Sequence, residues 1–333
     1  MPGRIDHILA LATTTPWAIH EDYARIIGAV LTRRAAGEPA SAETLRLAQE
    51  RAAAIEAARD AAATASTNGV AVIPVLGVVS ARASMLEQQS GMTSPEALGV
   101  AIDRAAADPG VKTIVLDVNS PGGTVAGTPE LAAKIRAARS AKQVVAQVSY
   151  QAASAAYWIA SQADEVVVSP SAEVGSIGVI AMHEDVSAKA KADGYAPTFI
   201  TAGKYKAEAH PFAPLSEEAR AEIQSKVDAA YEQFVGDVAK GRGVPVATAR
   251  GAKFGQGRMV TAADAVARGM ADRIATMDET LARFMGGGRV RSRTAAIAAE
   301  EPAEASPQAA SAPAVRSDAD LIELEIQAIP HGR

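Results

Sequence analysis

The chain has 333 residues, of which 48% are hydrophobic but only 4% aromatic, and its formal net charge is −5. This mild negative charge argues against a nucleic-acid-binding surface as the main function. The sequence contains no cysteine, which excludes disulfides, thiolate metal sites and cysteine catalysis, and its five histidines show no metal-ligand spacing. We therefore expect no metal or other cofactor, and a core built mainly from Ala, Val, Ile and Leu.

The first 67 residues are predicted to form an N-terminal helical region. Apolar residues at helical spacing begin at Pro16, and a second, alanine-rich helix is predicted from Ser41 to about Ala65. The first ten residues carry charges where a secretory signal needs an apolar run, and no stretch approaches the ~20 apolar residues of a membrane span. We expect a soluble, cytoplasmic protein without a membrane span or a nucleic-acid partner.

From residue 68 the sequence alternates between strand-like and helix-like segments. Strands that alternate with helices of about 10–15 residues indicate βα units and a largely parallel sheet. The predicted strands cover residues 70–79, 111–118, 143–148, 165–168, 179–182 and 197–200. The predicted helices cover residues 95–107 and 129–141, a segment that opens near residue 154, and residues 216–240 and 261–269. These elements form the predicted main domain, residues 68–285.

Residues 286–333 are predicted to be a disordered tail. A triple glycine and a stretch rich in Ala, Pro, Glu and Ser cannot bury enough apolar surface to offset the entropy of ordering. The apolar run from Leu321 to Ile326 is a candidate docking segment. The small residues from Ala309 to Ala312 lie in this tail, where extended chain is accessible to proteolysis.

Ser154 is the first candidate functional residue. It follows the strand-like run 143–148 and lies at the start of a helix rich in small residues, from Ala152 to Ala156. A hydroxyl at a strand-to-helix turn, near the positive end of the helix dipole, is well placed to act as a nucleophile.

Two further stretches complement this serine. The turn Ser120–Gly123, with the sequence Ser-Pro-Gly-Gly, follows a buried strand and can aim backbone N–H groups at an oxyanion. The loop Gly203–Phe212 holds Lys204 and Lys206. A lysine acts as a general base only if its environment lowers its pKa towards neutrality.

Together these stretches resemble the signal peptide peptidase A family of serine peptidases, including its phage branch of capsid (prohead) proteases. Four motifs carry the resemblance in the family's order: Ser120–Gly123, Ala153–Tyr157, Gly175–Gly178 and Gly203–Phe212. The resemblance covers roughly residues 68–274. It implies an α/β protein with the crotonase/Clp-like ββα superhelix fold.

The resemblance also implies a role for each site residue. Ser154 would be the nucleophile and Lys206 the general base of a Ser/Lys dyad. Ser176 would hydrogen-bond the lysine amine and orient it, and the N–H groups around Gly122 and Gly123 would form the oxyanion hole. The implied activity is that of a serine endopeptidase acting as a homo-oligomer, with residues 68–285 as its peptidase domain. Because the family favours small and apolar residues beside the cut, Ala309–Ala312 is then a candidate site at which the protein cleaves its own tail.

Two departures from the family bear on the branch and the activity. Ala155 and Ala156 stand where many members carry Gly-Gly, but both are small enough to preserve close packing. The membrane anchor usual in cellular members is not apparent, which favours a phage protease that acts on capsid, portal or scaffold proteins within a prohead in the host cytoplasm.

Several alternatives remain open at this point. One is a soluble bacterial protease of the signal-peptide-peptidase type, acting on signal-peptide-like peptides. Another is a Ser-His-Asp protease resembling the Clp peptidase, with His183 as the base. The others are a crotonase-type acyl-CoA enzyme, which needs no nucleophilic serine, and a non-catalytic capsid scaffold protein.

Overall fold

The computed structural model describes residues 16–20, 46, 53, 68–81 and 92–285. The predicted tail, with its docking segment and self-cleavage site, lies outside these residues, as does most of the predicted N-terminal helical region. Arg46 and Ala53 are the described positions within the predicted alanine-rich helix, and both are helical.

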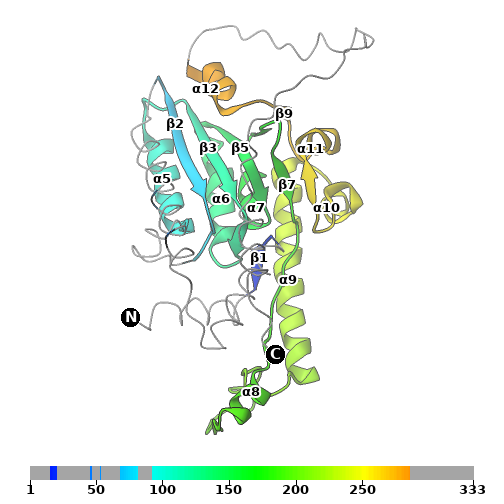
Figure 1. Ribbon diagram of the computed structural model, residues 1–333. Helices are drawn as coiled ribbons and strands as arrows, with labels where there is room; N and C mark the ends of the chain where they lie inside the picture. The colour runs from blue at the N-terminus through cyan, green and yellow to red at the C-terminus, as the bar shows by residue number, and fades with distance from the viewer. Residues whose placement is uncertain (1–15, 21–45, 47–52, 54–67, 82–91, 286–333) are drawn as a thin grey trace.

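The centre of the molecule is a mostly parallel β-sheet (Figure 1). Five strands follow one another in space, each parallel to its neighbour: β2 (Val70–Leu76), β3 (Thr113–Ser120), β5 (Gln143–Ala153), β6 (Glu165–Val168) and β9 (Arg273–Ile274). The last three residues of β5 pair with β7 (Glu173–Gly175), which in turn pairs antiparallel with β8 (Met259–Thr261). The predicted α/β class with a largely parallel sheet is confirmed.

Helices cover the two faces of this sheet. Alternate residues of β3 show the division: Ile114, Leu116 and Val118 face the main core, whereas Val115 faces the other side. The main core is covered by α5 (Pro95–Ala107), α6 (Thr128–Ala138), α7 (Ala155–Ala160) and part of α9 (Glu217–Arg242). The opposite face is covered by α12 (Met277–Met285). The remaining short helices are α8 (Ser187–Ala192), α10 (Val246–Arg250), the 3₁₀ helix η1 (Ala252–Phe254) and α11 (Ala262–Arg268).

Capping residues explain why the longer helices begin where the sequence indicates. Ser94 accepts a hydrogen bond from the Ala97 N–H at the start of α5, and Pro95 occupies the first turn, where a missing N–H costs nothing. Ser216 caps α9 in the same way, and Gly243, with φ of 64°, ends it in the left-handed conformation. The predicted helices 95–107 and 216–240 are confirmed.

Three sequence-based predictions of local structure are wrong. Residues Trp17–Ile19 form a strand, β1, rather than the first turn of a helix, and they pair antiparallel with β4 (Gly122–Thr124). The predicted strand 179–182 contributes only Ile180, as an isolated bridge to Trp17. The predicted strand 197–200 forms no ladder, and its Ile200 is 96% exposed. In the last two segments the apolar residues Met182, Phe199 and Ile200 are exposed, and no strand of the described chain pairs with them.

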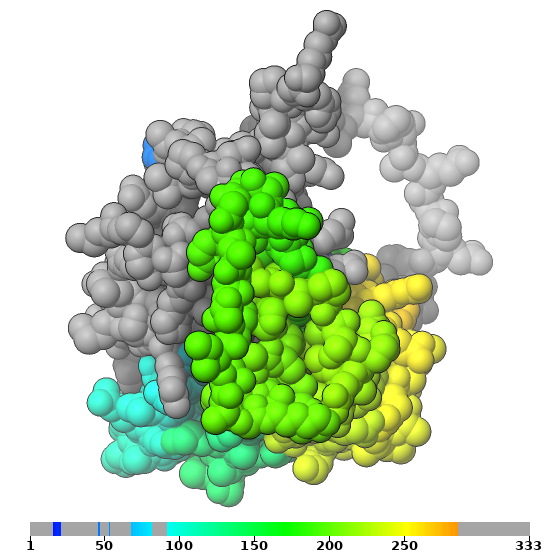
Figure 2. Space-filling model, turned by 90° about the horizontal axis from the view of Figure 1, so that it is seen from below, coloured from blue at the N-terminus to red at the C-terminus, as the bar shows by residue number. Residues whose placement is uncertain are grey.

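Residues 181–215 form a projecting segment, which we call the arm. It contains α8 and lies with the first turns of α9 at the lower end of the molecule (Figure 1). Viewed from below, the arm stands against α9 as a separate ridge (Figure 2). Its rings pack mainly on one another: Phe199 stacks on His210 with ring centroids 4.3 Å apart, and Tyr195 contacts Phe212.

Candidate active site

Ser154 lies at the junction of β5 and α7 in a strained backbone conformation. Its φ is 53° and its ψ is −117°, a combination that residues with a Cβ rarely adopt. The side chain is buried, and its Oγ donates a hydrogen bond to the Gly178 carbonyl oxygen at 3.3 Å. The Ser154 N–H donates to the Gly175 carbonyl oxygen at 2.7 Å. This strain is held by hydrogen bonds on both the main chain and the side chain.

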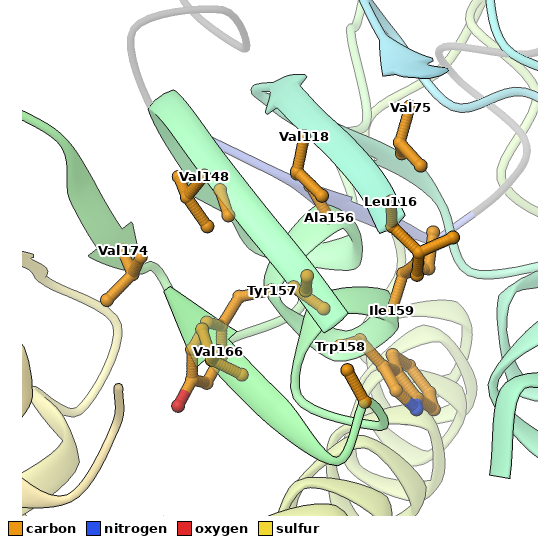
Figure 3. Packing of buried hydrophobic residues seen from close by; sticks show 14 of the residues in the cluster. Val75, Leu116, Val118, Val148, Ala156, Tyr157, Trp158, Ile159, Val166 and Val174 are labelled. Atoms are coloured by element: carbon orange, nitrogen blue, oxygen red, sulfur yellow. The ribbon is translucent and has the colours of Figure 1, made fainter. Parts of the chain in front are cut away.

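The helix behind Ser154 is fixed by two large aromatic side chains, Tyr157 and Trp158 (Figure 3). The Tyr157 hydroxyl donates to the Met270 carbonyl oxygen at 2.9 Å, and burial raises the pKa of Tyr157 well above its ordinary value, so the phenol stays a donor. Trp158 stacks on Phe234 at 4.5 Å and donates through Nε1 to the Asp237 carboxylate at 3.1 Å. Helix α9 therefore holds α7, and with it Ser154, in place.

The Gly122–Gly123 turn packs directly against the main chain around Ser154. Gly122 has a φ of 95°, and a Cβ there would lie 2.8 Å from the Ala153 carbonyl oxygen and 3.0 Å from the Ala155 nitrogen. A Cβ on Gly123 would lie 1.7 Å from the Val79 carbonyl oxygen. Only glycine fits at either position, and the Gly122 N–H donates to the Ser120 Oγ at 3.2 Å.

Ser176 is brought close to Ser154 through the segment Gly175–Gly178. Two carbonyl oxygens of this segment accept hydrogen bonds from Ser154, one at each end. Ser176 itself has a φ of 52° and donates its N–H to the Arg258 carbonyl oxygen at 3.0 Å. It is almost completely buried. The structure thus gathers Ser154, Ser176 and the two glycines of the turn, four of the five predicted site residues.

Lys206, the fifth, lies apart from them in the arm. It is exposed, and no hydrogen bond or ion pair of its side chain is present among the described residues. Lys204 is engaged instead: its Nζ donates to the Tyr205 hydroxyl at 2.8 Å and to Glu218 at 3.0 Å, and these hydrogen bonds raise its pKa. The alternative base His183 lies 3.4 Å from the His210 carbonyl oxygen, within the arm.

Two components of the site were not assigned from the sequence. The Gly178 carbonyl oxygen, which accepts from the Ser154 hydroxyl, belongs to a motif whose role had been given to Ser176 alone. Strand β1 lies beside Gly122 and Gly123 although the sequence suggested a helix there. The sequence offered no clear signal for β1, because three residues are too few to show the alternation of a strand.

Two features were not found in the described part of the chain. Across residues 68–81 and 92–285, and the few described before them, no helix has the length and apolar character to cross a membrane. Within the same residues no group of three or more His, Cys, Asp or Glu side chains is placed to hold a metal ion.

A serine presented on a strained turn between a strand and a helix is typical of serine hydrolases. Comparison with known families narrows this class. Residues 136–291 match the model of peptidase family S49. The chain therefore carries a peptidase family S49 domain, and the match includes Ser154, Ser176 and Lys206.

Individual relatives include phage and cellular proteins. The chain is 31% identical over 252 residues to capsid assembly protease C of Escherichia phage lambda, across 73% of this chain and 57% of that protein. It is 30% identical over 254 residues to head-tail preconnector protein GP5 of Enterobacteria phage P21, across 74% of this chain and 51% of that protein. A putative signal peptide peptidase of Enterococcus faecium is 30% identical over 175 residues, half of its length. The chain thus spans little more than half the length of these relatives.

Proposed function

We propose that this chain is a serine endopeptidase in which Ser154 attacks the peptide bond. The observation that carries the proposal is the buried, strained Ser154, with the Gly-Gly turn packed on one side and residues 175–178 on the other. Strain at a single residue persists only where its surroundings enforce it, and such residues cluster at active sites. The matched peptidase family and the relatives named as proteases support this activity.

In the proposed reaction the Lys206 amine takes the proton from the Ser154 hydroxyl as Oγ attacks the scissile carbonyl carbon. Ser176 accepts a hydrogen bond from the amine or donates one to it, and so aims it. Negative charge develops on the carbonyl oxygen and is stabilised by N–H groups of Gly122 and Gly123. The Gly122 N–H donates to the Ser120 Oγ at 3.2 Å, so it becomes available to the oxyanion when the Ser120 side chain changes its χ1 rotamer.

The proposed base requires a second copy of the chain. Ser154 and Ser176 are buried at the sheet, whereas Lys206 is exposed on the arm. The arm also exposes Ile200 and Tyr205, apolar surface of the kind that subunit contacts cover. We propose a homo-oligomer in which the arm of one copy places Lys206 beside Ser154 of its neighbour, on the crotonase/Clp-like superhelix fold that the parallel sheet is compatible with.

The proposed substrates are proteins of a phage head, namely capsid, portal or scaffold proteins, cleaved within a prohead in the host cytoplasm. The names of two relatives, a capsid assembly protease and a head-tail preconnector protein, support this assignment. The cellular signal peptide peptidase among the relatives keeps signal-peptide-like substrates as the alternative.

The test compares the wild-type protein with Ser154→Ala on an unfolded protein substrate, with and without a fluorophosphonate that labels nucleophilic serines. We expect the variant to lose at least 10³-fold in rate, because it lacks the attacking oxygen, and the label to appear on the wild-type Ser154 peptide by mass spectrometry. Ser140→Ala, which removes an exposed hydroxyl at the end of α6, is the matched control and should leave both readouts unchanged.

The outcome separates the alternatives. Cleavage that survives in Ser154→Ala excludes this serine as the nucleophile. A crotonase-type enzyme would act on an acyl-CoA thioester without labelling at Ser154, and a scaffold protein would show neither cleavage nor labelling.

A further inference from the structure

Strand β1 lies between two segments that both lead to Ser154. On one side it pairs antiparallel with β4, with Ala18 opposite Gly123 and Ile19 opposite Gly122. On the other side Trp17 exchanges both of its main-chain hydrogen bonds with Ile180, each 2.8 Å long. Figure 1 shows β1 at the lower end of the sheet, below α7. Its three residues are buried and form the middle of a small antiparallel arrangement.

The contacts of Gly122 show how near β1 comes to the nucleophile. A Cβ built on Gly122 would lie 2.3 Å from the Ala18 carbonyl oxygen, and the same point is close to main-chain atoms on both sides of Ser154. The other partner, Ile180, is two residues beyond Gly178, whose carbonyl oxygen accepts from the Ser154 hydroxyl. Both neighbours of β1 are therefore parts of the candidate active site.

A protease substrate binds in extended conformation by adding a strand to exposed main-chain edges. Beside Ser154 the edges available for such pairing are those of β4 and of residues 178–180, and β1 pairs with both of them. A peptide cannot use edges that are already paired. We infer that Trp17–Ile19 occupies the substrate groove of this peptidase as a built-in substitute for substrate, and that it must leave before a peptide bond reaches Ser154. This inference rests on the proposed function.

For β1 to leave the groove, main-chain hydrogen bonds at both of its ends also have to break. The His20 N–H donates to the Pro121 carbonyl oxygen at 2.9 Å, and the Val125 N–H donates to the Pro16 carbonyl oxygen at 3.4 Å. The strand is only three residues long, so a longer peptide gains more pairing than β1 loses. A segment of the same chain nevertheless competes at an effective concentration of the order of millimolar, which keeps the site closed to dilute short peptides.

A reversible disulfide tests the inference without removing any part of the chain. Because the main-chain groups of Trp17 face Ile180, the Trp17–Thr124 pair on the other edge is of the non-hydrogen-bonded kind, with Cα atoms about 4.5 Å apart. That separation suits a disulfide, and the chain has no cysteine of its own to interfere. The double variant Trp17→Cys, Thr124→Cys locks β1 when oxidised and, lacking the tryptophan anchor, loosens it when reduced.

The expected result is a peptidase rate at least tenfold lower in the oxidised double variant than in the reduced one, with the wild type unaffected by reductant and slower than the reduced variant. The single variants Trp17→Cys and Thr124→Cys, treated identically, control for loss of each side chain. Equal rates in the oxidised and reduced forms, with the disulfide confirmed by mass spectrometry, overturn the inference.

A binding readout keeps this result separate from the proposed chemistry. The cysteine pair is combined with Ser154→Ala, and a fluorescent peptide with the sequence of residues 16–20 is titrated in each redox state. Binding in the reduced form and its loss in the oxidised form support occupation of the groove even if no variant cleaves anything, in which case the proposed function alone fails. Equal binding in both forms overturns the inference even in an active peptidase.

Discussion

Gly123 is a position where one methyl group would disturb the turn that packs against Ser154. A Cβ there would meet the Val79 carbonyl oxygen at 1.7 Å, so the main chain itself must move. We expect Gly123→Ala to lower the free energy of unfolding by about 3 kcal/mol and to abolish cleavage. Gly236→Ala is the control, because a Cβ there meets nothing within 4 Å inside helix α9 and should stabilise by about 0.5–1 kcal/mol. Urea unfolding and a peptidase assay measure both effects.

The two lysines of the arm are expected to differ sharply in their effect on activity. Arginine keeps its proton at accessible pH, so Lys206→Arg should be as inactive as Lys206→Ala, with a loss of at least 10²-fold. Lys204 is held protonated by the Tyr205 hydroxyl and Glu218, and Lys204→Ala should retain most of the activity. Steady-state cleavage rates of Lys206→Arg, Lys206→Ala and Lys204→Ala on one peptide test these expectations. An essential Lys204 beside a dispensable Lys206 would show that the motif had been aligned two residues out of place.

At the scale of elements, the contact between α9 and α7 depends on one buried carboxylate. Asp237 accepts from the Trp158 indole at 3.1 Å and pairs with Arg136 at 3.3 Å. Replacing it by alanine leaves both donors without this acceptor, so we expect Asp237→Ala to cost about 3–5 kcal/mol. Asp103→Ala, which breaks an exposed pair with Lys134, should cost less than about 1 kcal/mol. Chemical denaturation of the two variants should therefore differ several-fold, and similar losses would contradict this role.

Helix α12 is attached to the sheet by a carboxylate that makes its docking pH-dependent. Burial alone would raise the pKa of Glu165, but hydrogen bonds and charges from Arg283 of α12 and from Arg273 outweigh it and hold that pKa below its ordinary 4.5. A carboxyl group whose pKa is lower in the folded than in the unfolded protein stabilises the fold above pH 4.5. This stabilisation is lost as the pH falls through the folded-state pKa. The pairing of Asp272 with Arg242 adds to the same trend, since its pKa is also lowered despite burial.

We therefore expect the free energy of unfolding to fall as the pH drops below the ordinary glutamate pKa of 4.5, and Glu165→Gln to flatten that fall while costing about 1–2 kcal/mol at pH 7. Urea titrations at several pH values measure both quantities. An unchanged pH slope in Glu165→Gln would show that other carboxylates carry the acid sensitivity.

The elements that were predicted correctly are those whose own sequence carries a clear local pattern. Helix α5 was predicted over residues 95–107, the range that it occupies, and β3 and β6 were predicted from short apolar runs rich in valine. Strand β1 was mistaken for a helix because three residues are too few to show a period of two, and their partner, β4, is more than 100 residues away in the sequence. Residues 197–200 have a strand-like composition but no strand to pair with, so local preference alone could not place them.

The candidate site was likewise predicted from the sequence only in part. Sequence motifs indicated Ser154, Ser176, Gly122 and Gly123. The fold gathers all four because β3, which leads into the Gly122–Gly123 turn, lies beside β5, and β5 lies beside β7. The positive φ of Ser154 and the Gly178 carbonyl contact are products of that tertiary arrangement and have no signature in the motif itself.

For the whole molecule, the separation of Lys206 from Ser154 leads to a complementation experiment. Ser154→Ala and Lys206→Ala are each expected to be inactive, but mixed oligomers formed by co-expression should regain about a quarter of the wild-type rate. Half of the sites then receive an intact serine, and half of those receive an intact lysine from the neighbour. If the dyad forms within one chain, every site lacks one partner and no activity returns. Size-exclusion chromatography of the mixture confirms that assembly occurred.

Helix α9 also has a mechanical consequence. In its second half, Phe234 and Asp237 contact Trp158, which lies behind Ser154. Its first part, Glu217 to Gln233, extends about 25 Å towards the arm with mostly exposed side chains. If α9 behaves as a rigid body fixed at its contact with Trp158, a tilt of about 10° there moves its N-terminal end by about 4 Å. The converse also holds: a force applied to the arm is transmitted through α9 to α7, the helix that begins after Ser154. In the proposed oligomer, contacts made by the arm would therefore be coupled to the position of Ser154 through α9.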